Sequence, residues 1–231
     1  MAKGSLCVRT MKIFLDTANL EAIRKYNDMG ILDGVTTNPT LISKEKGDPA
    51  EIMTEIVRTV KGPVSLEVVS TDTQGMLEEA HRLKKFGSNV VVKIPMIPDG
   101  LKALKVLKQE GINTNCTLIF SANQAVLAAK AGATYASPFI GRLDDAGQVG
   151  MDVVRESVQI FKNYNFSTQI LVASIRHPLH VIEAGKIGAD VVTMPPDVLE
   201  KMIKHPLTDK GLNMFLDDWE KVKKANPRLA I

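Results

Sequence analysis

The sequence predicts an α/β fold, a (β/α)8 TIM barrel with an extra C-terminal helix. Three observations support this prediction: short apolar runs alternate with helical segments, the alternation repeats eight times, and the repeats occupy about 195 residues. Such alternation is typical of a parallel sheet covered by helices, and eight units of this length favour a closed barrel. An open doubly wound sheet is the alternative, but no G-x-G-x-x-G motif follows any apolar run.

The first four units each pair an apolar run with a helical segment. Gly30, Gly87 and Gly111 stand where helices of these units are expected to end, and Asp99 stands where the fourth helix is expected to begin. We predict strands over residues 12–17, 34–37, 64–69 and 89–95, with helices over 20–29, 48–60, 72–86 and 99–110.

The second four units follow the same pattern. Ser121 and Gly132 are expected to cap the two ends of one helix, and Pro178 and Gly188 the ends of another. An acidic, glycine-containing loop is expected after the sixth strand. We predict strands over residues 112–119, 135–140, 169–175 and 190–194, with helices over 121–132, 150–164, 178–188 and 196–203.

The barrel is expected to form one catalytic domain over residues 11–205, between two smaller segments. Residues 1–10 read as a disordered N-terminal extension ahead of Met11, which could be the natural start. Residues 206–231 contain a predicted helix over 209–223 whose apolar residues share one face, followed by a tail. That face could pack against its own barrel or against a neighbouring subunit, and we expect the C-terminal segment to make a subunit contact.

Composition excludes several classes of protein. The net charge of +3 on 231 residues is too small to indicate binding to nucleic acid or to a membrane surface. Nowhere do 18 apolar residues run together, and no signal peptide is visible. Cys7 and Cys116 have no motif spacing, so a disulfide framework or a zinc site is not expected. We therefore expect a cytoplasmic enzyme that needs no metal or cofactor.

Lys93 stands inside the most apolar of the predicted strands, within the run Asn-Val-Val-Val-Lys-Ile-Pro. Lysine is rarely buried, so its place in a β-branched run needs a reason. In one interpretation the side chain reaches solvent at the strand end or pairs with a carboxylate. In the other, burial favours the neutral amine, which is the nucleophile of Schiff-base chemistry.

Polar residues at the carboxyl ends of the other strands decide in favour of the second interpretation, because the chemistry of a barrel is placed at that end. They are Asp16, Asn38, Glu67, Asn115, Thr117, Ser137, Ser174, Arg176 and Thr193. Glu67 and Thr117 could shuttle protons through a water when a carbinolamine dehydrates. Asp16 could take a proton from a substrate hydroxyl, and Arg142, Ser174 and Arg176 could hold a phosphate.

Six ordered motifs carry a resemblance to a known family. The set resembles that of the transaldolases, specifically the short microbial subfamily, which is related to fructose 6-phosphate aldolase. The resemblance extends from Met11 to about Val222. The motifs are residues 14–19 (FLDTAN), 34–40 (GVTTNPT), 91–95 (VVKIP), 115–118 (NCTL), 137–142 (SPFIGR) and 173–176 (ASIR).

The resemblance implies a class I mechanism in which a dihydroxyacetone unit passes from a ketose phosphate to an aldose phosphate. Lys93 would form the Schiff base, Asp16 would act as acid and base, and Glu67 with Thr117 would place the catalytic water. The subfamily also implies a homo-pentamer or homo-decamer. Asn38, Asn115 and Ser137 would contact the dihydroxyacetone unit, Arg142, Ser174 and Arg176 would contact the phosphate, and Phe139 would also belong to the substrate-binding residues.

Two other functions stay open at this point. The related aldolases release free dihydroxyacetone, and the resemblance implies that they carry glutamine where this chain has Glu67 and tyrosine where it has Phe139. A barrel that only binds sugar phosphate would leave the lysine and the two carboxylates without a role. His177 and His180 could be read as a metal pair, but no third ligand at metal spacing accompanies them.

Overall fold

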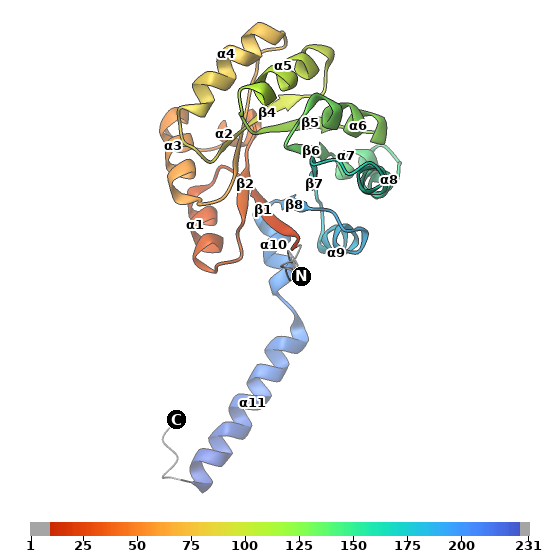
Figure 1. Ribbon diagram of the computed structural model, residues 1–231. Coiled ribbons are helices and arrows are strands. Elements are labelled where there is room, and N and C mark those ends of the chain that lie inside the picture. Colours follow the sequence, from red (N-terminus) through yellow and green to blue (C-terminus); the bar gives the residue numbers. More distant parts are fainter. Residues whose placement is uncertain (1–9, 227–231) are drawn as a thin grey trace, which may run out of the picture.

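The computed structural model describes residues 10–226 and contains a closed barrel of eight parallel strands surrounded by helices (Figure 1). The strands are hydrogen-bonded in chain order from β1 to β8, and β1 pairs with β8 to close the barrel. The predicted (β/α)8 TIM barrel with an additional C-terminal helix is confirmed. The disordered extension expected over residues 1–10 lies, apart from Thr10, outside the described residues.

The strands are short, and each is followed by at least one helix. The strands are β1 Lys12–Asp16, β2 Gly34–Thr36, β3 Val64–Glu67, β4 Val90–Pro95, β5 Thr114–Ile119, β6 Tyr135–Pro138, β7 Gln169–Val172 and β8 Val191–Met194. The helices are α1 Leu20–Asp28, α2 Pro39–Ile42, α3 Pro49–Thr59, α4 Thr73–Lys84, α5 Pro98–Gln109, α6 Ala122–Ala131, α7 Ile140–Asp145, α8 Gly150–Asn163, α9 Pro178–Ile187, α10 Pro196–Ile203 and α11 Pro206–Ala225.

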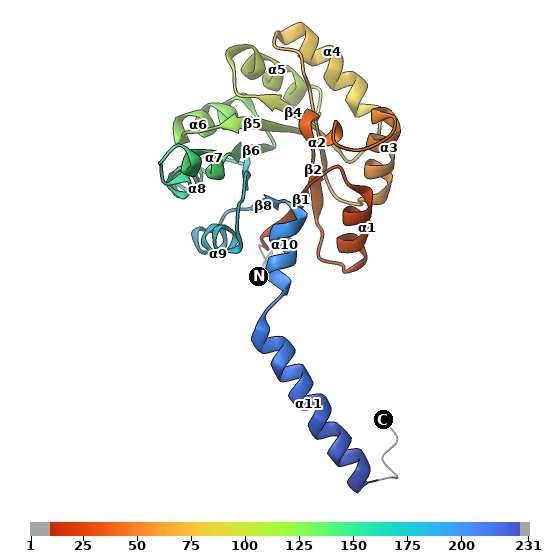
Figure 2. The ribbon, with the colours of Figure 1, turned by 180° about the vertical axis from the view of Figure 1, so that it is seen from behind.

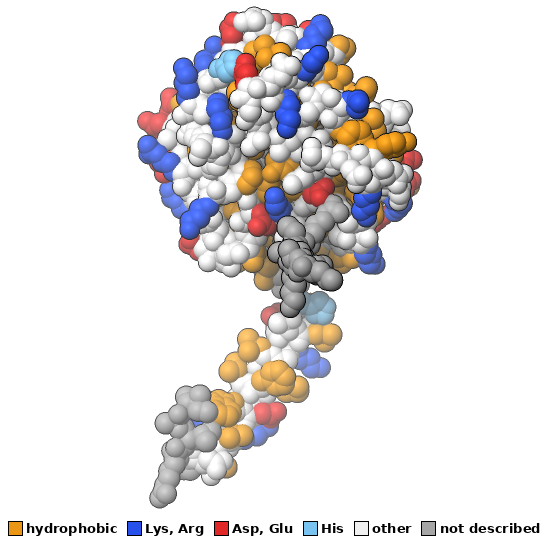
Figure 3. All heavy atoms as spheres, in the orientation of Figure 1, with side chains coloured by type: hydrophobic (Ala, Val, Ile, Leu, Met, Phe, Trp, Pro, Cys, Tyr) orange, Lys and Arg blue, Asp and Glu red, His pale blue; other side chains and the backbone are white. Residues whose placement is uncertain are grey.

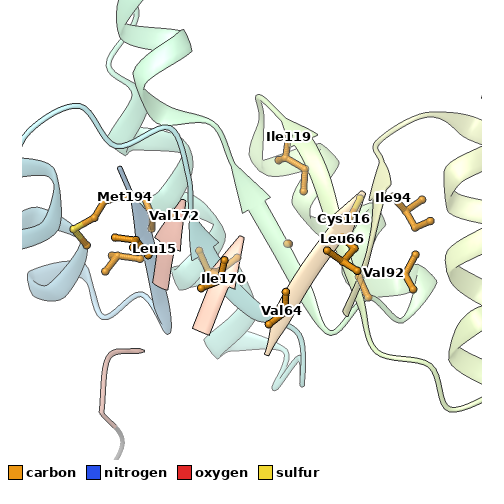
Figure 4. Packing of buried hydrophobic residues seen from close by; sticks show 14 of the residues in the cluster. Leu15, Val64, Leu66, Val92, Ile94, Cys116, Ile119, Ile170, Val172 and Met194 are labelled. Carbon is orange, nitrogen blue, oxygen red and sulfur yellow. The ribbon is translucent and has the colours of Figure 1, made fainter. Parts of the chain in front are cut away.

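Alternation along each strand divides its side chains between two cores. One set points outward and packs against the surrounding helices, as Figure 4 shows for ten labelled residues that include Leu15, Leu66, Val92 and Val172. The other set forms a smaller cluster within the barrel, made of Phe14, Val91, Tyr135, Leu171, Ala173 and Val191. Because successive side chains point to opposite faces, the two patterns are out of phase by one residue.

The same alternation places polar side chains inside the barrel above this apolar layer. Along β4, Val91 belongs to the inner cluster, and two residues later the inward position is occupied by Lys93. Along β1, Phe14 is followed by Asp16 in the same way. The apolar cluster therefore forms a floor, and the polar residues lie at the carboxyl end of the barrel.

Helix ends follow the predicted caps at several places. The Ser121 side chain accepts the N–H of Gln124, and Gly132 and Gly188 end their helices in the left-handed conformation. Asp99 was wrongly predicted as a cap, because α5 begins earlier, after Ile97. Asp99 instead lies in the first turn of the helix and accepts a hydrogen bond from the hydroxyl of Thr73.

Three features near the carboxyl end of the barrel differ from the prediction. The acidic loop expected after β6 is the short helix α7, and α2 follows β2 directly where no helix was predicted. β7 ends at Val172 rather than at residue 175, because Ser174 has a positive φ of 61° that extended strands do not adopt. These irregular segments surround the mouth of the barrel, where loops position functional groups.

The C-terminal helix α11 projects away from the barrel in both views of the ribbon (Figures 1 and 2). None of its residues is buried. The helix therefore does not pack against its own barrel, which was one of the two predicted arrangements. No helix within residues 10–226 is both long and apolar enough to cross a membrane.

Candidate active site

A cavity of about 580 Å³ opens at the carboxyl end of the barrel. It brings together most of the residues that were predicted to be functional. Those that line it are Asp16, Asn38, Glu67, Lys93, Asn115, Ser137, Phe139, Arg142, Ser174 and Arg176. They come from seven of the eight strands and the segments that follow them, so the closed barrel is what brings them to one place.

Lys93 lies at the bottom of this cavity and is only 4% exposed. Its Nζ lies 3.0 Å from Oε2 of Glu67 and donates to the carbonyl oxygen of Thr37 at 3.2 Å. Glu67 is the register partner of Lys93 on the neighbouring strand, which explains the pairing. The pairing with a carboxylate that the first interpretation predicted is therefore present. It satisfies the requirement that buried charges be paired, and the same contact provides a path for a proton to leave the amine.

Asp16 lies close enough to Lys93 for the two charges to interact. Its Oδ1 accepts a hydrogen bond from the Thr36 hydroxyl at 2.7 Å, and the Thr36 hydroxyl is in turn 2.7 Å from that of Thr193. Burial raises the pKa of the Asp16 carboxyl, against the opposing effects of Lys93 and Thr36. A carboxylate that is poorly solvated binds a proton more strongly, so Asp16 is suited to both accept and return one.

A hydrogen-bonded chain of three polar side chains, on β3, β5 and β6, lies beside Lys93. Asn115 is the register partner of Lys93 on β5 and is fully buried. Its amide nitrogen donates to the Ser65 hydroxyl at 3.3 Å, and its amide oxygen accepts from the Ser137 hydroxyl at 2.6 Å. This chain fixes the orientation of the Asn115 amide beside the amine.

Thr117 differs from the other predicted residues because it does not line the cavity. It is fully buried, and its hydroxyl has no hydrogen-bond partner within residues 10–226. The strand around it is irregular: the pairing of β5 with β6 shifts between Cys116 and Ile119, and Leu118 has a positive φ of 60°. A buried hydroxyl without a partner is suited to bind a water molecule, which is the role predicted for it.

Phe139 and Arg142 form the side of the cavity that follows β6. The Phe139 ring centroid lies 5.9 Å from Nζ of Lys93 and 5.6 Å from Cζ of Arg142. The ring is therefore within the range of cation–π attraction for both the amine and the guanidinium. Phe139 presents no hydroxyl to the lysine, and Arg142 is exposed at the rim.

Arg176 and Ser174 follow β7 and reach the same rim. Nη2 of Arg176 forms an ion pair with Oδ2 of Asp145 at 2.7 Å. The first turn of α7 packs closely on this segment: a Cβ at Gly141 would lie 2.2 Å from the carbonyl oxygen of Ser174 and 2.7 Å from Nε of Arg176. Glycine at position 141 therefore allows the two predicted phosphate-binding segments to come together.

Asn38 has a structural role as well as its place at the rim. Its side-chain oxygen accepts the N–H of Leu41 at 2.9 Å and caps α2. The cap holds the amide in a fixed position over the cavity. The side chains of Thr36 and Ser65, which the predicted set of site residues omitted, stand two residues before Asn38 and Glu67. Side chains two residues apart on a strand point to the same face, so Thr36 and Ser65 could have been predicted to face the inside of the barrel from the positions of Asn38 and Glu67.

The two histidines considered as a metal pair have other partners. His177 and His180 stack with ring centroids 3.7 Å apart, and Nε2 of His180 lies 3.2 Å from Oδ2 of Asp144. Within the described part of the chain, no group of three His, Cys, Asp or Glu side chains is arranged to hold a metal ion.

Comparison with known proteins gives matches over nearly the whole chain. The family model described as "Transaldolase/Fructose-6-phosphate aldolase" matches residues 13–230. A protein of Nitrosopumilus maritimus named "Probable transaldolase" is 66% identical over 96% of this chain and 100% of its own length. Proteins with the same name from Petrotoga mobilis and Thermoplasma volcanium are 64% and 61% identical, over 91% and 92% of this chain and 96% of each relative.

Proposed function

The chain belongs to the transaldolase/fructose-6-phosphate aldolase family, and we propose that it is a transaldolase that works through a Schiff base on Lys93. The donor would be sedoheptulose 7-phosphate or fructose 6-phosphate, and the acceptor glyceraldehyde 3-phosphate or erythrose 4-phosphate. This exchange belongs to the non-oxidative pentose phosphate pathway, and we place the protein in the cytoplasm. The observation that carries the proposal is the buried amine of Lys93, 3.0 Å from the Glu67 carboxylate at the bottom of the cavity.

In the first step the amine of Lys93 attacks the ketone carbon of the donor. The Glu67 carboxylate is close enough to accept the proton that the amine must lose before it can attack. The carbinolamine that forms then loses water, for which Glu67 supplies a proton through a water held by the Thr117 hydroxyl. Asn115 and Ser137, joined at 2.6 Å, bind the hydroxyls of the dihydroxyacetone unit.

In the second step Asp16 removes the proton of the donor hydroxyl next to the bond that breaks. The bond cleaves, the Schiff base becomes an enamine, and the shortened aldose phosphate leaves. Burial raises the pKa of Asp16, which makes the carboxylate a stronger base than an exposed one. The reverse sequence adds the acceptor aldehyde to the enamine, with Asp16 returning the proton.

The phosphate of each substrate would be held at the rim by Arg142, Ser174 and Arg176. Arginine presents a planar set of donors that matches phosphate oxygens. The ion pair of Arg176 with Asp145 is exposed, and such pairs contribute little, so a phosphate can compete for the guanidinium. Because both donor and acceptor carry their phosphate at the far end from the reacting carbonyl, one rim serves both.

Transaldolase is favoured over aldolase by the residues beside the lysine. A carboxylate such as Glu67 can exchange protons with the catalytic water, whereas an amide can only orient it. Phe139 offers no hydroxyl that could help to protonate the enamine. The enamine should then persist until an aldehyde arrives.

An assay of both products with and without erythrose 4-phosphate tests this proposal. We expect turnover of fructose 6-phosphate to require the acceptor, and we expect Phe139→Tyr to increase the release of free dihydroxyacetone. Rapid release by the native protein without an acceptor would make it an aldolase. No turnover in either condition, together with binding of fructose 6-phosphate, would leave a barrel that only binds sugar phosphate.

The C-terminal helix is the element for which we propose contact with another copy of the chain. Figure 3 shows hydrophobic side chains on the projecting arm, where they meet solvent rather than the barrel. Leu207, Leu212, Met214, Phe215 and Leu216 are each more than half exposed. An exposed apolar surface of this kind, on a helix with no residue buried against its own barrel, is typical of a subunit interface. We propose a homo-pentamer or homo-decamer, as in the short subfamily that the sequence resembles.

A further inference from the structure

His180 is a buried titratable residue that the proposed mechanism does not use. It lies in the first turn of α9 and is 7% exposed. Its Nδ1 lies 3.3 Å from the backbone nitrogen of Arg176, which donates to it. The ring therefore holds the backbone of the residue whose side chain reaches the rim of the cavity.

The second ring nitrogen of His180 connects to the segment that follows β6. Its Nε2 lies 3.2 Å from Oδ2 of Asp144, and Oδ1 of Asp144 accepts the N–H of Gly150 at 2.9 Å. A backbone N–H can only donate, so Nδ1 carries no hydrogen while it accepts from Arg176. The hydrogen of the neutral ring is then on Nε2, where it faces the Asp144 carboxylate. Both nitrogens are satisfied in this one form.

We propose that His180 is a positioning residue, which places Arg176 for the substrate phosphate by accepting its backbone N–H, while the contact with Asp144 holds the imidazole ring in the form that can accept it. The proposal rests on the proposed function, because it assumes that Arg176 binds a phosphate. It adds a determinant of phosphate recognition that does not itself touch the substrate. Arg176 has its own side-chain partner, Asp145, so one acidic residue holds the guanidinium while the histidine fixes the backbone.

The charged and titratable groups around His180 keep the ring in the form that this role needs. They are Arg176, His177, Asp144 and Glu183. Burial is the largest effect and lowers the pKa of His180, and His177 and Arg176 act in the same direction against Asp144 and Glu183. The ring is therefore neutral at pH 7. Protonation would put a hydrogen on Nδ1, opposite the N–H that it now accepts.

Three substitutions separate the two contacts of the ring. The amide oxygen of asparagine can occupy the position of Nδ1, so His180→Asn can still accept the Arg176 N–H. Glutamine reaches the position of Nε2 instead, so His180→Gln can keep the contact with Asp144 but not the one with Arg176. His180→Leu removes both. The matched control is His81→Leu, which removes another histidine–carboxylate contact, that of His81 with Glu110 at 2.7 Å on the outer helices.

Two measurements are made on each full-length variant: the KM for fructose 6-phosphate, and the half-saturating concentration of dihydroxyacetone for borohydride trapping on the protein. Dihydroxyacetone has no phosphate, so trapping reports the lysine and the groups that bind the dihydroxyacetone unit, without the phosphate site. We expect KM to rise about tenfold in His180→Gln and His180→Leu, the size expected for one lost hydrogen bond. We expect His180→Asn and His81→Leu to stay near the native KM, and trapping to be unchanged in all four.

Other results would overturn the inference. If His180→Leu keeps the native KM, the ring does not position Arg176. If all His180 variants lose trapping together with fructose 6-phosphate turnover, the residue only stabilises the fold. If the native protein itself does not turn over fructose 6-phosphate, the proposed function fails, and this outcome is distinguishable because it is seen before any substitution is made.

Discussion

Substitution of Gly141 by alanine should damage phosphate recognition while leaving the lysine intact. A Cβ at this position would lie 2.2 Å from the carbonyl oxygen of Ser174, whereas ordinary contact begins at 3.4 Å. The segment after β7 and the first turn of α7 must therefore separate by about 1.2 Å. The same Cβ would lie 2.7 Å from Nε of Arg176, so the displacement falls on two of the predicted phosphate ligands. A misplacement of about 1 Å can cost roughly 100-fold in rate.

Gly87→Ala is the matched control, because it is also crowded but lies before the amino end of β4. A Cβ there would lie 2.5 Å from Cγ1 of Val57, far along the barrel from the cavity. We expect either substitution to lower the free energy of unfolding by about 1–3 kcal/mol. Thermal unfolding should then shift down by about 2–4 °C for each kcal/mol lost.

The two variants should differ in kinetics. We expect kcat/KM for fructose 6-phosphate with erythrose 4-phosphate to fall about 10- to 100-fold in Gly141→Ala, mostly through KM, and to stay within about twofold in Gly87→Ala. Borohydride trapping of dihydroxyacetone should be the same in both. If Gly141→Ala is destabilised but keeps the native kcat/KM, the segment around Ser174 and Arg176 does not hold the phosphate.

Two further predictions concern the acid–base residue and the assembly. The Thr36 hydroxyl donates a hydrogen bond to Asp16, which opposes the effect of burial on the pKa of the Asp16 carboxyl. Thr36→Val should therefore raise this pKa further and move the acid limb of the kcat/KM profile to higher pH. Thr193→Val keeps the hydrogen bond from Thr36 to Asp16, so it should move the acid limb less. An unchanged limb in Thr36→Val would remove Asp16 as the titrating base. Truncation after His205, which removes α11, should lower the mass measured by light scattering, and a native protein that is monomeric at micromolar concentration would rule out the proposed assembly.

The sequence allowed the barrel to be predicted because its periodicity is redundant. The same alternation of a short apolar strand and a helix is repeated eight times along the chain. Small errors at strand ends, such as those at β3 and β7, therefore did not change the predicted number or order of the strand–helix units. The Lys93–Glu67 pair could be expected for the same reason, since both residues stand at the inward positions near strand ends. The alternation of inward and outward side chains along each strand is enough to place both residues on the inner face of the barrel.

The irregular segments at the mouth could not be predicted in the same way. The positive φ values of Leu118 and Ser174 are set by packing around the bulge and the turn, not by residue type, since neither residue favours that conformation. Thr117 was predicted at the carboxyl end of the barrel together with Asn115, but it does not line the cavity, and the pairing of its strand with β6 is irregular. The contact of His180 with the backbone of Arg176 depends on how α9 is placed, which no local pattern encodes.

Identification of the amine that reacts with the donor tests the central claim most directly. The native protein is incubated with fructose 6-phosphate and borohydride, digested, and its peptides are weighed. We expect a dihydroxyacetone-derived mass on Lys93, and no adduct in Lys93→Arg, because arginine cannot supply a neutral amine at this pH. A stable adduct on any other lysine, or turnover with no adduct on Lys93, would contradict the account.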